Sequence, residues 1–326
     1  MGSELVKVKG REVAGQGGGL VLPALIDQAG PRAGKRFVEF FTADIRNPNT
    51  REAYARAVAR FLEWCEARGL DLQSIEPLHV AAYIEGLQSG LSKPSVKQHL
   101  AALKRLFDWL VTGQVIPMNP ASSVRGPKHL VRKGKTPVLM GEEARELLAS
   151  IDTSTVNGLR DRALIALMVY SFARVGAALA LKVEDYYLER KRGRVRLHEK
   201  GGKVITMPTH HNAEAFLDDY IEAAGIADDR KGPIFRTIGK NRKLSGNAMT
   251  RNDALRMIKK RVGAAGLPPE VCCHTFRATG ITVYMRNGGK LERAQEMAGH
   301  ADPRTTGLYN RADDEITLDE VERIVL

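Results

Sequence analysis

Six residues in the second half of the chain have side chains suited to binding and attacking a phosphate group. They are Arg174, Lys200, His274, Arg277, His300 and Tyr309. Cationic side chains can neutralise phosphate oxygens, histidines can exchange protons, and a tyrosine hydroxyl can act as a nucleophile. The motif HTFR places a histidine and an arginine on one helix face, and in GHADPRTTGLYNR a tyrosine follows a histidine by nine residues. Each signal is weak by itself, but their order along the chain indicates one site.

The sequence around these residues resembles the tyrosine recombinase, or phage integrase, family of site-specific DNA recombinases. The matching pieces are FARVGAALALKVED, HEKGGKVITMP, HTFRATG and AGHADPRTTGLYNR. The resemblance extends over roughly residues 36–312. The chain departs from the family pattern at three places. Phe172-Ala173 replaces the usual Gly-Leu, Gly176-Ala177 stands where Ser-Glu or Arg-Glu is common, and Ala278 replaces a frequent histidine. None of these departures removes a catalytic group.

The resemblance implies a phosphate-binding role for three members of the set. Arg174 and Arg277 would hold the non-bridging oxygens of a DNA phosphodiester and neutralise the charge that grows in the transition state. His300 would hydrogen-bond the phosphate or support the nucleophile. Removing one such electrostatic donor from an enzyme typically lowers the rate by ~10²–10³.

The other three members would carry out the bond-breaking step. Tyr309 is implied as the nucleophile, and because a phenol has a pKa near ~10 it needs a base or a strong electrostatic pull. His274 is the candidate acceptor of its proton. Lys200, at the tip of a hairpin, would protonate the leaving 5′ oxygen. The covalent 3′-phosphotyrosine link stores the bond energy, so strands can be resealed without ATP, metal or any other cofactor.

Metal-dependent chemistry is the main alternative suggested by the acidic residues. Four aspartates could suggest a two-metal nuclease: Asp218, Asp219, Asp228 and Asp229. They fall around an amphipathic helix and a turn, so we interpret them as solvated surface acids. The adjacent pair His210 and His211 has no further ligand at useful spacing. The three cysteines include no CxxC pair, which indicates a reducing cytoplasm without a disulfide framework or a zinc site.

The elements that must position these residues are predicted to be mainly α-helical. Residues 1–35 contain GQGGGL and are interpreted as a flexible N-terminal arm. Residues 36–126 are expected to form a small helical core DNA-binding domain, and residues 127–136 a basic linker. Residues 137–326 are expected to form a mostly helical catalytic domain that ends in an exchange helix. Together the two domains would clamp DNA.

Local patterns predict individual elements within the two domains. Asn49, followed three residues later by Glu52, predicts a capping box at the start of a long helix. The stretch GLRDRALIALMVYSFARVGAALALKVEDY is predicted to be helical, with an apolar core helix that Arg174 ends. RVRLHEKGGKVITMP alternates apolar and polar residues on both sides of a Gly-Gly turn, which predicts a β-hairpin and therefore a small antiparallel sheet.

The charge of the chain favours a polyanionic partner. The formal net charge is +12, and no run of 18 or more apolar residues could span a membrane. Basic residues outside the six-residue set are candidates for contacts to double-stranded DNA, chiefly to its phosphate backbone. They are Lys93, Lys97, Lys104, Arg105, Arg125, Lys128, Arg132, Lys133, Lys135, Lys203, Lys259 and Lys260.

The resemblance also implies an assembly. Two DNA sites would be held by a homo-tetramer, with a dimer on each site, and the amphipathic tail around Leu318 and Val321 would pack into a neighbouring protomer or onto its own domain. Integration, excision and dimer resolution remain open, as do accessory proteins. The expected location is the cytoplasm, at the nucleoid. Two other functions are kept as alternatives, a type IB-like topoisomerase and a catalytically idle, site-specific DNA-binding regulator.

Overall fold

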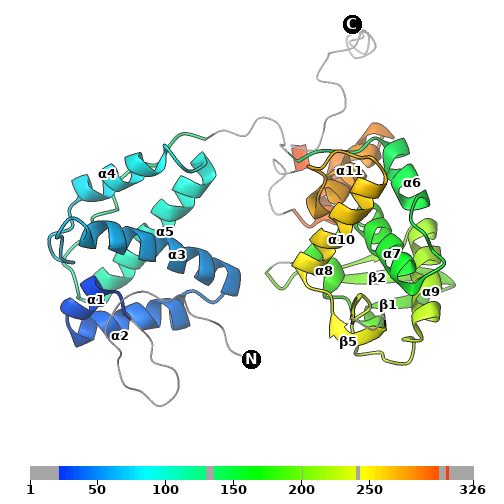
Figure 1. Cartoon of the computed structure of the whole chain (residues 1–326), viewed down its shortest axis with the longest axis horizontal. Coiled ribbons are helices and arrows are strands. Elements are labelled where there is room, and N and C mark those ends of the chain that lie inside the picture. Colours follow the sequence, from blue (N-terminus) through cyan, green and yellow to red (C-terminus); the bar gives the residue numbers. More distant parts are fainter. Residues whose placement is uncertain (1–21, 130–135, 200, 240–242, 301–305, 308–326) are drawn as a thin grey trace, which may run out of the picture. The chain divides into compact units, whose positions relative to one another are not determined.

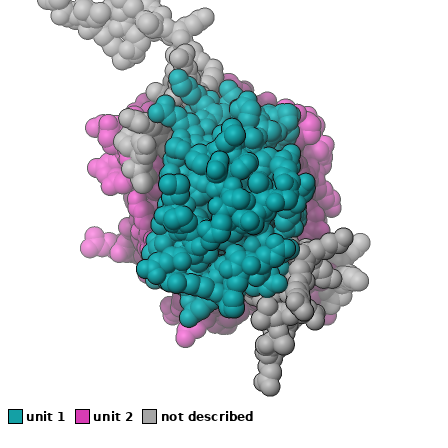
Figure 2. Space-filling model, turned by 90° about the vertical axis from the view of Figure 1, so that its left-hand side faces the viewer, with its two compact units in different colours: residues 1–130 teal, residues 131–326 magenta. Residues whose placement is uncertain are grey.

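The computed structural model describes residues 22–129, 136–199, 201–239, 243–300 and 306–307. The chain divides into two compact units, residues 1–130 and residues 131–326, which Figure 2 colours separately. Each unit has its own cluster of buried apolar side chains. In the part of the chain that is described, no helix combines the length and apolar character needed to cross a membrane.

Over its described residues, 22–129, the first unit contains helices and no strand (blue to cyan in Figure 1). They are α1 (Ala24–Gln28), α2 (Pro31–Glu39), a π-helical turn (Phe40–Asp44), α3 (Pro48–Glu66), α4 (Pro77–Leu87) and α5 (Lys93–Thr112). The long helices α3 and α5 pack against each other and bury Phe61 and Phe107, whose rings meet edge to face at 5.9 Å. Interlocked aromatic and aliphatic side chains therefore form the core of this unit.

Two details of the first unit differ from the sequence prediction. The segment just before residue 36 is not an arm: α1 and most of α2 lie there, and Leu25 and Ile26 are buried in the core. The long helix α3 begins at Pro48 rather than at the predicted Asn49 cap. The side chain of Asn47 accepts hydrogen bonds from the backbone of Asn49 and Thr50. Proline is suited to the first helical position, because its missing N–H would have no partner there.

The second unit is mostly helical, with small sheets (green to orange in Figure 1). Its helices are α6 (Gly141–Ala149), α7 (Val156–Tyr170), α8 (Val175–Leu179), α9 (His211–Ala224), α10 (Arg251–Ala264), α11 (Cys273–Arg286) and α12 (Leu291–Ala298), with a 3₁₀ turn at Val183–Asp185. Its strands are β1 (Tyr186–Glu189), β2 (Arg192–His198), β3 (Val204–Pro208), β4 (Arg236–Ile238) and β5 (Leu244–Ala248).

The predicted hairpin is confirmed as β2 and β3. The two strands are antiparallel, with His198 opposite Val204, and β1 adds to the other edge of β2 to give the order β1-β2-β3. Val195 and Leu197 point into the core, while Arg194 and Arg196 alternate with them on the more exposed side. The strands β4 and β5 form a separate two-stranded sheet that the sequence pattern did not predict.

Helix α7 lies at the centre of the second unit and packs against α9 and α11. Residues 163–168 are all buried, so apolar side chains surround this part of the helix instead of forming a stripe along one face. The predicted end of this helix at Arg174 is wrong. The helix ends at Tyr170, and a turn precedes the short helix α8. Phe172 in this turn has φ of 56°, a conformation that no α-helix accommodates.

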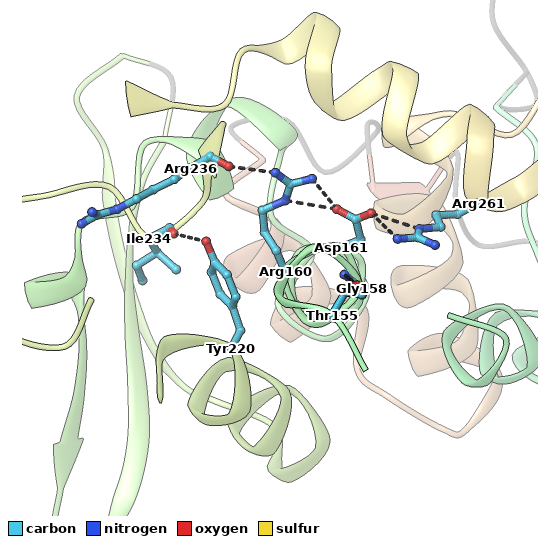
Figure 3. A network of polar contacts seen from close by, with 8 residues as sticks. All are labelled: Thr155, Gly158, Arg160, Asp161, Tyr220, Ile234, Arg236 and Arg261. Atoms are coloured by element: carbon cyan, nitrogen blue, oxygen red, sulfur yellow. Dashed lines mark hydrogen bonds and ion pairs between the residues drawn. The ribbon is translucent and has the colours of Figure 1, made fainter. Parts of the chain in front are cut away.

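A buried ionic network joins α7 to its neighbours (Figure 3). The guanidinium of Arg160 donates to Oδ1 of Asp161 at 3.1 and 2.7 Å, and that of Arg261 on α10 donates to Oδ2 at 3.0 and 2.8 Å. Arg160 also donates to the backbone oxygen of Arg236 on β4, at 2.9 Å. One carboxylate therefore holds two arginines and connects α7, α10 and β4.

Candidate active site

The turn after α7 sets the position of Arg174. Phe172 inserts its ring into a small apolar cluster with Ala278, Ile281, Ala294 and Ala298, which lie on α11 and α12. Burial of this ring offsets the cost of a left-handed backbone at a residue other than glycine. Arg174 then caps the start of α8 with extended backbone angles, and its side chain remains partly exposed.

Gly280 on α11 allows α7 and α11 to approach closely. A Cβ at this position would lie 2.0 Å from the backbone oxygen of Val169 and 2.9 Å from the ring of Phe172, so a larger residue would force the helices apart. Arg277 lies one turn earlier on α11 and is fully buried. Its Nη1 donates to the backbone oxygen of Phe172. The two predicted arginines are thus positioned by the same contact between α7 and α11.

The far side of Arg277 faces the end of α12. Its Nη2 donates to the backbone oxygen of Ala298 and lies 2.7 Å from Nε2 of His300. His300 follows Gly299, which ends α12 with φ of 61°. A Cβ at Gly299 would meet Ile205 of β3 at 2.7 Å, so glycine satisfies both the backbone angle and the packing. The predicted glycine–histidine pair is therefore a helix end that places His300 on Arg277.

The partners of His300 determine which ring nitrogen carries the proton. A guanidinium can only donate, so Nε2 must be the acceptor in the contact with Arg277. Nδ1 then carries the hydrogen and donates to Oγ1 of the buried Thr306, at 2.8 Å. Burial and the charge of Arg277 lower the pKa of His300 to about 4. The ring is consequently neutral at pH 7.

His274 occupies the first turn of α11, one helical turn before Arg277. Its ring reaches solvent, yet the surrounding protein, Arg277 and Arg174 lower its pKa below the usual range. A neutral imidazole can accept a proton, which is the role that the resemblance implies for this residue.

Glu199 is a member of this cluster that the sequence analysis missed. Its carboxylate is 3% exposed and forms ion pairs with Arg174, through Oε2, and with Arg277, through Oε1 at 4.0 Å. An acid beside a lysine in a basic hairpin has the pattern of a surface residue, and nothing in the local sequence signals its burial. The structure thus brings together Arg174, His274, Arg277 and His300 around a carboxylate. Lys200 and Tyr309 lie outside the described residues.

An open hollow of about 470 Å³ adjoins His300. Its other lining residues are Lys203, Lys290, Glu292, Arg293, Gln295 and Glu296. The charge of Lys203 is one of the causes that lower the pKa of His300, which places this lysine beside the cluster. In the described part of the chain, no group of three or more histidine, cysteine or acidic side chains is arranged to hold a metal ion.

The predicted DNA-contacting residues of the first unit are distributed over its surface. Lys93, Lys97 and Arg105 on α5 are exposed, as are Arg125 and Lys128 after it. Arg105 makes a two-pronged ion pair with Asp44, at 2.8 and 2.9 Å, which uses two of the five N–H donors of its guanidinium and offsets its charge.

Three further residues predicted to contact DNA lie on α5 and α10. Lys104 is partly buried and donates to the backbone oxygen of Ser122 at 3.1 Å. Lys259 and Lys260 are exposed on α10, and Lys259 donates to the backbone oxygen of Pro269. The linker residues Arg132, Lys133 and Lys135 lie outside the described residues.

Comparison with known proteins identifies both units. The phage integrase family model matches residues 137–315, and the model of the N-terminal SAM-like domain of phage integrases matches residues 35–114. Tyrosine recombinase XerD of Listeria monocytogenes serotype 4b (strain F2365) is 29% identical over 264 residues, which cover 80% of this chain and 87% of the relative. Tyrosine recombinase XerC of Xanthomonas campestris pv. campestris (strain B100) is 28% identical over 268 residues, with coverage of 81% and 79%.

Solved structures share the fold. The XerH site-specific recombinase, bound to its palindromic difH substrate after cleavage, superposes with a TM-score of 0.70 at 21% identity and covers 90% of this chain and 88% of its own. A lambda integrase (75–356) dimer on a COC' core site gives a TM-score of 0.65 at 20% identity, with coverage of 87% and 97%. The catalytic-domain model alone matches more than half of the chain. The chain belongs to the phage integrase family of tyrosine recombinases.

Proposed function

We propose that this protein is a site-specific tyrosine recombinase, which cuts double-stranded DNA and rejoins it through a 3′-phosphotyrosine intermediate. The observation that carries the proposal is the contact of Arg277 with His300 beside Arg174. It gathers two permanent cations and a neutral imidazole from three separate segments of the chain. Such preorganised donors stabilise charge that develops on a phosphate in the transition state. The named relatives are tyrosine recombinases, which supports the same reaction class.

Each residue of the set has a defined task in this reaction. Arg174 and Arg277 bind the non-bridging oxygens, and His300, with its proton on Nδ1, keeps Nε2 as an acceptor towards Arg277. Neutral His274 accepts the proton of the attacking phenol. Tyr309 forms the phosphodiester bond to the 3′ phosphate as the bond to the 5′ oxygen breaks. Lys200 supplies the proton to that leaving oxygen, and the reverse steps reseal the strand.

The partner is double-stranded DNA, held by both units as a clamp. Recombination joins two duplex sites, so we propose a homo-tetramer with a dimer on each site, acting in the cytoplasm at the nucleoid. The XerH and lambda integrase structures were solved with DNA substrates, and the lambda integrase structure is a dimer on one core site. Both observations support this arrangement.

Covalent trapping tests the proposal. The full chain is incubated in EDTA with a nicked suicide DNA that carries candidate sites from around its own gene, and the mixture is run on a denaturing gel. The wild-type protein and a Tyr54→Phe control, changed in the first unit, are expected to form a protein–DNA adduct. Tyr309→Phe is expected to form none, because it lacks the nucleophilic oxygen.

Other outcomes would contradict the assigned nucleophile or identify one of the two alternative functions. An adduct that survives in Tyr309→Phe contradicts the assignment of the nucleophile. Relaxation of supercoiled DNA without dependence on sequence would identify a type IB-like topoisomerase. Tight binding to one sequence without an adduct on any substrate would identify an idle DNA-binding regulator.

A further inference from the structure

Glu199 is held at the junction between the small sheet and the two active-site arginines. It directly follows β2, and its backbone N–H donates to the backbone oxygen of Lys203 at 2.7 Å, which closes the hairpin below its tip. Its side chain leaves the hairpin and enters the protein interior, where the carboxylate is 3% exposed. The next residue in the chain is Lys200.

Both oxygens of this carboxylate face an arginine. Oε2 pairs with Nη1 of Arg174, and Oε1 lies 4.0 Å from Nη1 of Arg277. The short helix α8 that follows Arg174 has the sequence VGAAL and offers no acid of its own. The carboxylate that joins the two arginines therefore comes from the sheet, a different part of the fold.

We propose that Glu199 is a positioning residue of the active site, whose carboxylate bridges Arg174 and Arg277 and fixes the direction in which both guanidinium groups meet the phosphate. The proposal rests on the recombinase function proposed above. It adds to the six-residue set a residue that acts through the arginines rather than on the DNA.

The electrostatics of the cluster require such a bridge. Arg277 is fully buried, and a second permanent cation next to it would repel it in a medium of low dielectric constant. A carboxylate between them compensates both charges, and two oxygens in fixed places also fix the orientation of two planar guanidinium groups. Arg174 gains most from this, because its side chain is 37% exposed and would otherwise rotate freely in solvent.

Glu199 also couples the arginines to the β2–β3 hairpin, in whose sequence the proposed general acid Lys200 follows directly. Any displacement of the hairpin base moves the carboxylate, and Lys200 is covalently attached to the same residue. A shift of the hairpin base would therefore change the position of the carboxylate that pairs with both arginines. An enzyme gains from such coupling because reacting groups must be aligned within a fraction of an ångström.

Single-turnover cleavage of the suicide DNA tests the proposal with Glu199→Gln in the full chain. The variant keeps the size of the side chain and removes its charge. We expect cleavage to slow by about 10²-fold, comparable to the loss of one electrostatic donor, with DNA affinity changed by only a few fold. Glu199→Asp, which keeps the charge but shortens the reach, is expected to retain more activity than Glu199→Gln.

Asp185→Asn is the matched control. Asp185 is a carboxylate 5% exposed beside the same strand, at 3.1 Å from His198 and 3.7 Å from Arg196, and it pairs with neither active-site arginine. If Glu199 were merely a structural residue, the two variants would show similar losses of thermal stability and of cleavage rate. We expect the large loss of cleavage in Glu199→Gln alone.

A substrate with a neutral methylphosphonate at the cleavage site separates positioning from folding. Its reacting group lacks the negative oxygen that the arginines neutralise, so the penalty of Glu199→Gln is expected to shrink to less than about tenfold. An unchanged or faster rate in Glu199→Gln, or an equal penalty on both substrates, would overturn the proposal. If Glu199→Gln does not fold, the cleavage penalties on the two substrates are measured with Glu199→Asp instead. A wild-type protein without a Tyr309-dependent adduct overturns the recombinase function, and the role of Glu199 with it.

Discussion

The charge state of His300 follows from its two partners. Arg277 fixes Nε2 as an acceptor, and Thr306 receives the hydrogen of Nδ1. Protonation would place two cations 2.7 Å apart in a buried site, which is why the pKa falls to about 4. The spacing of histidine and tyrosine in the sequence locates His300, but it contains no information on its tautomer. That property depends on an arginine 23 residues earlier in the chain.

This depressed pKa predicts a pH dependence of the free protein. In NMR spectra the ring of His300 should keep the shifts of a neutral Nδ1–H imidazole from pH 8 down to about pH 5, whereas histidines of the denatured protein titrate near ~6.5. Below pH 6.5 the unfolded chain binds a proton that the folded chain does not. Stability should therefore be lost as the pH falls from 6.5 towards 4, at up to about 1.4 kcal/mol per pH unit.

A comparison of variants isolates the contribution of this residue. Urea unfolding of His300→Asn should show a weaker dependence on pH over the same interval. Protonation of His300 near pH 6.5 in the folded protein would contradict the contact with Arg277. Bound DNA should raise the pKa, because a phosphate anion stabilises the imidazolium.

At the scale of elements, sequence patterns predict what local periodicity determines. The β2–β3 hairpin and the helices α9 to α12 all have clear turn or helical signals. The break between α7 and α8 has none, because MVYSFARVGA has no proline, and no glycine before Arg174, so the break depends on Phe172 packing against α11. The sheet of β4 and β5 is missed for a similar reason: three and five residues are too few to show an alternation.

The buried carboxylate of Asp161 predicts how strongly the elements of the second unit depend on one another. Asp161→Ala leaves Arg160 and Arg261 without their shared counter-charge, and Arg160 has a side chain only 8% exposed. We expect the free energy of unfolding to fall by about 3–5 kcal/mol, measured by urea denaturation. Asp219→Ala removes an ion pair with Arg162 in which the acid is 55% exposed, and should cost no more than about 1 kcal/mol.

The comparison of these two variants tests the role of the network directly. If both cost the same, the carboxylate would not be the connection between α7, α10 and β4 that Figure 3 depicts. Addition of Arg261→Met to Asp161→Ala should recover part of the loss, because one of the two uncompensated charges is then removed.

At the scale of the whole molecule, the division into two units agrees with the position of the basic, proline- and glycine-containing segment that the sequence marks as a linker. Each unit buries its own core, so neither needs the other to satisfy its apolar side chains. What the sequence cannot provide is the extent of the first unit towards the N-terminus. Leu25 and Ile26 join its core through contacts with helices far along the chain, and a short apolar pair in a glycine-rich region does not signal this.

The linker predicts a protease pattern that depends on DNA. Trypsin cleaves after lysine and arginine, and Arg125, Lys128, Arg132, Lys133 and Lys135 have no acid among them. Brief digestion of the free protein should first give fragments that end in this stretch, close to the boundary between residues 130 and 131. DNA should slow these cuts, because phosphates that neutralise the cationic side chains also shield them from the protease. The protection should disappear near ~1 M salt, where the Debye length falls to ~3 Å.

A glutamate-specific protease is the control, since it has no site between residues 125 and 137 and should not separate the units there. First cuts within either compact unit would show that this segment is not an exposed linker. Linker cuts at the same rate with and without DNA at low salt would show that it is not a DNA contact.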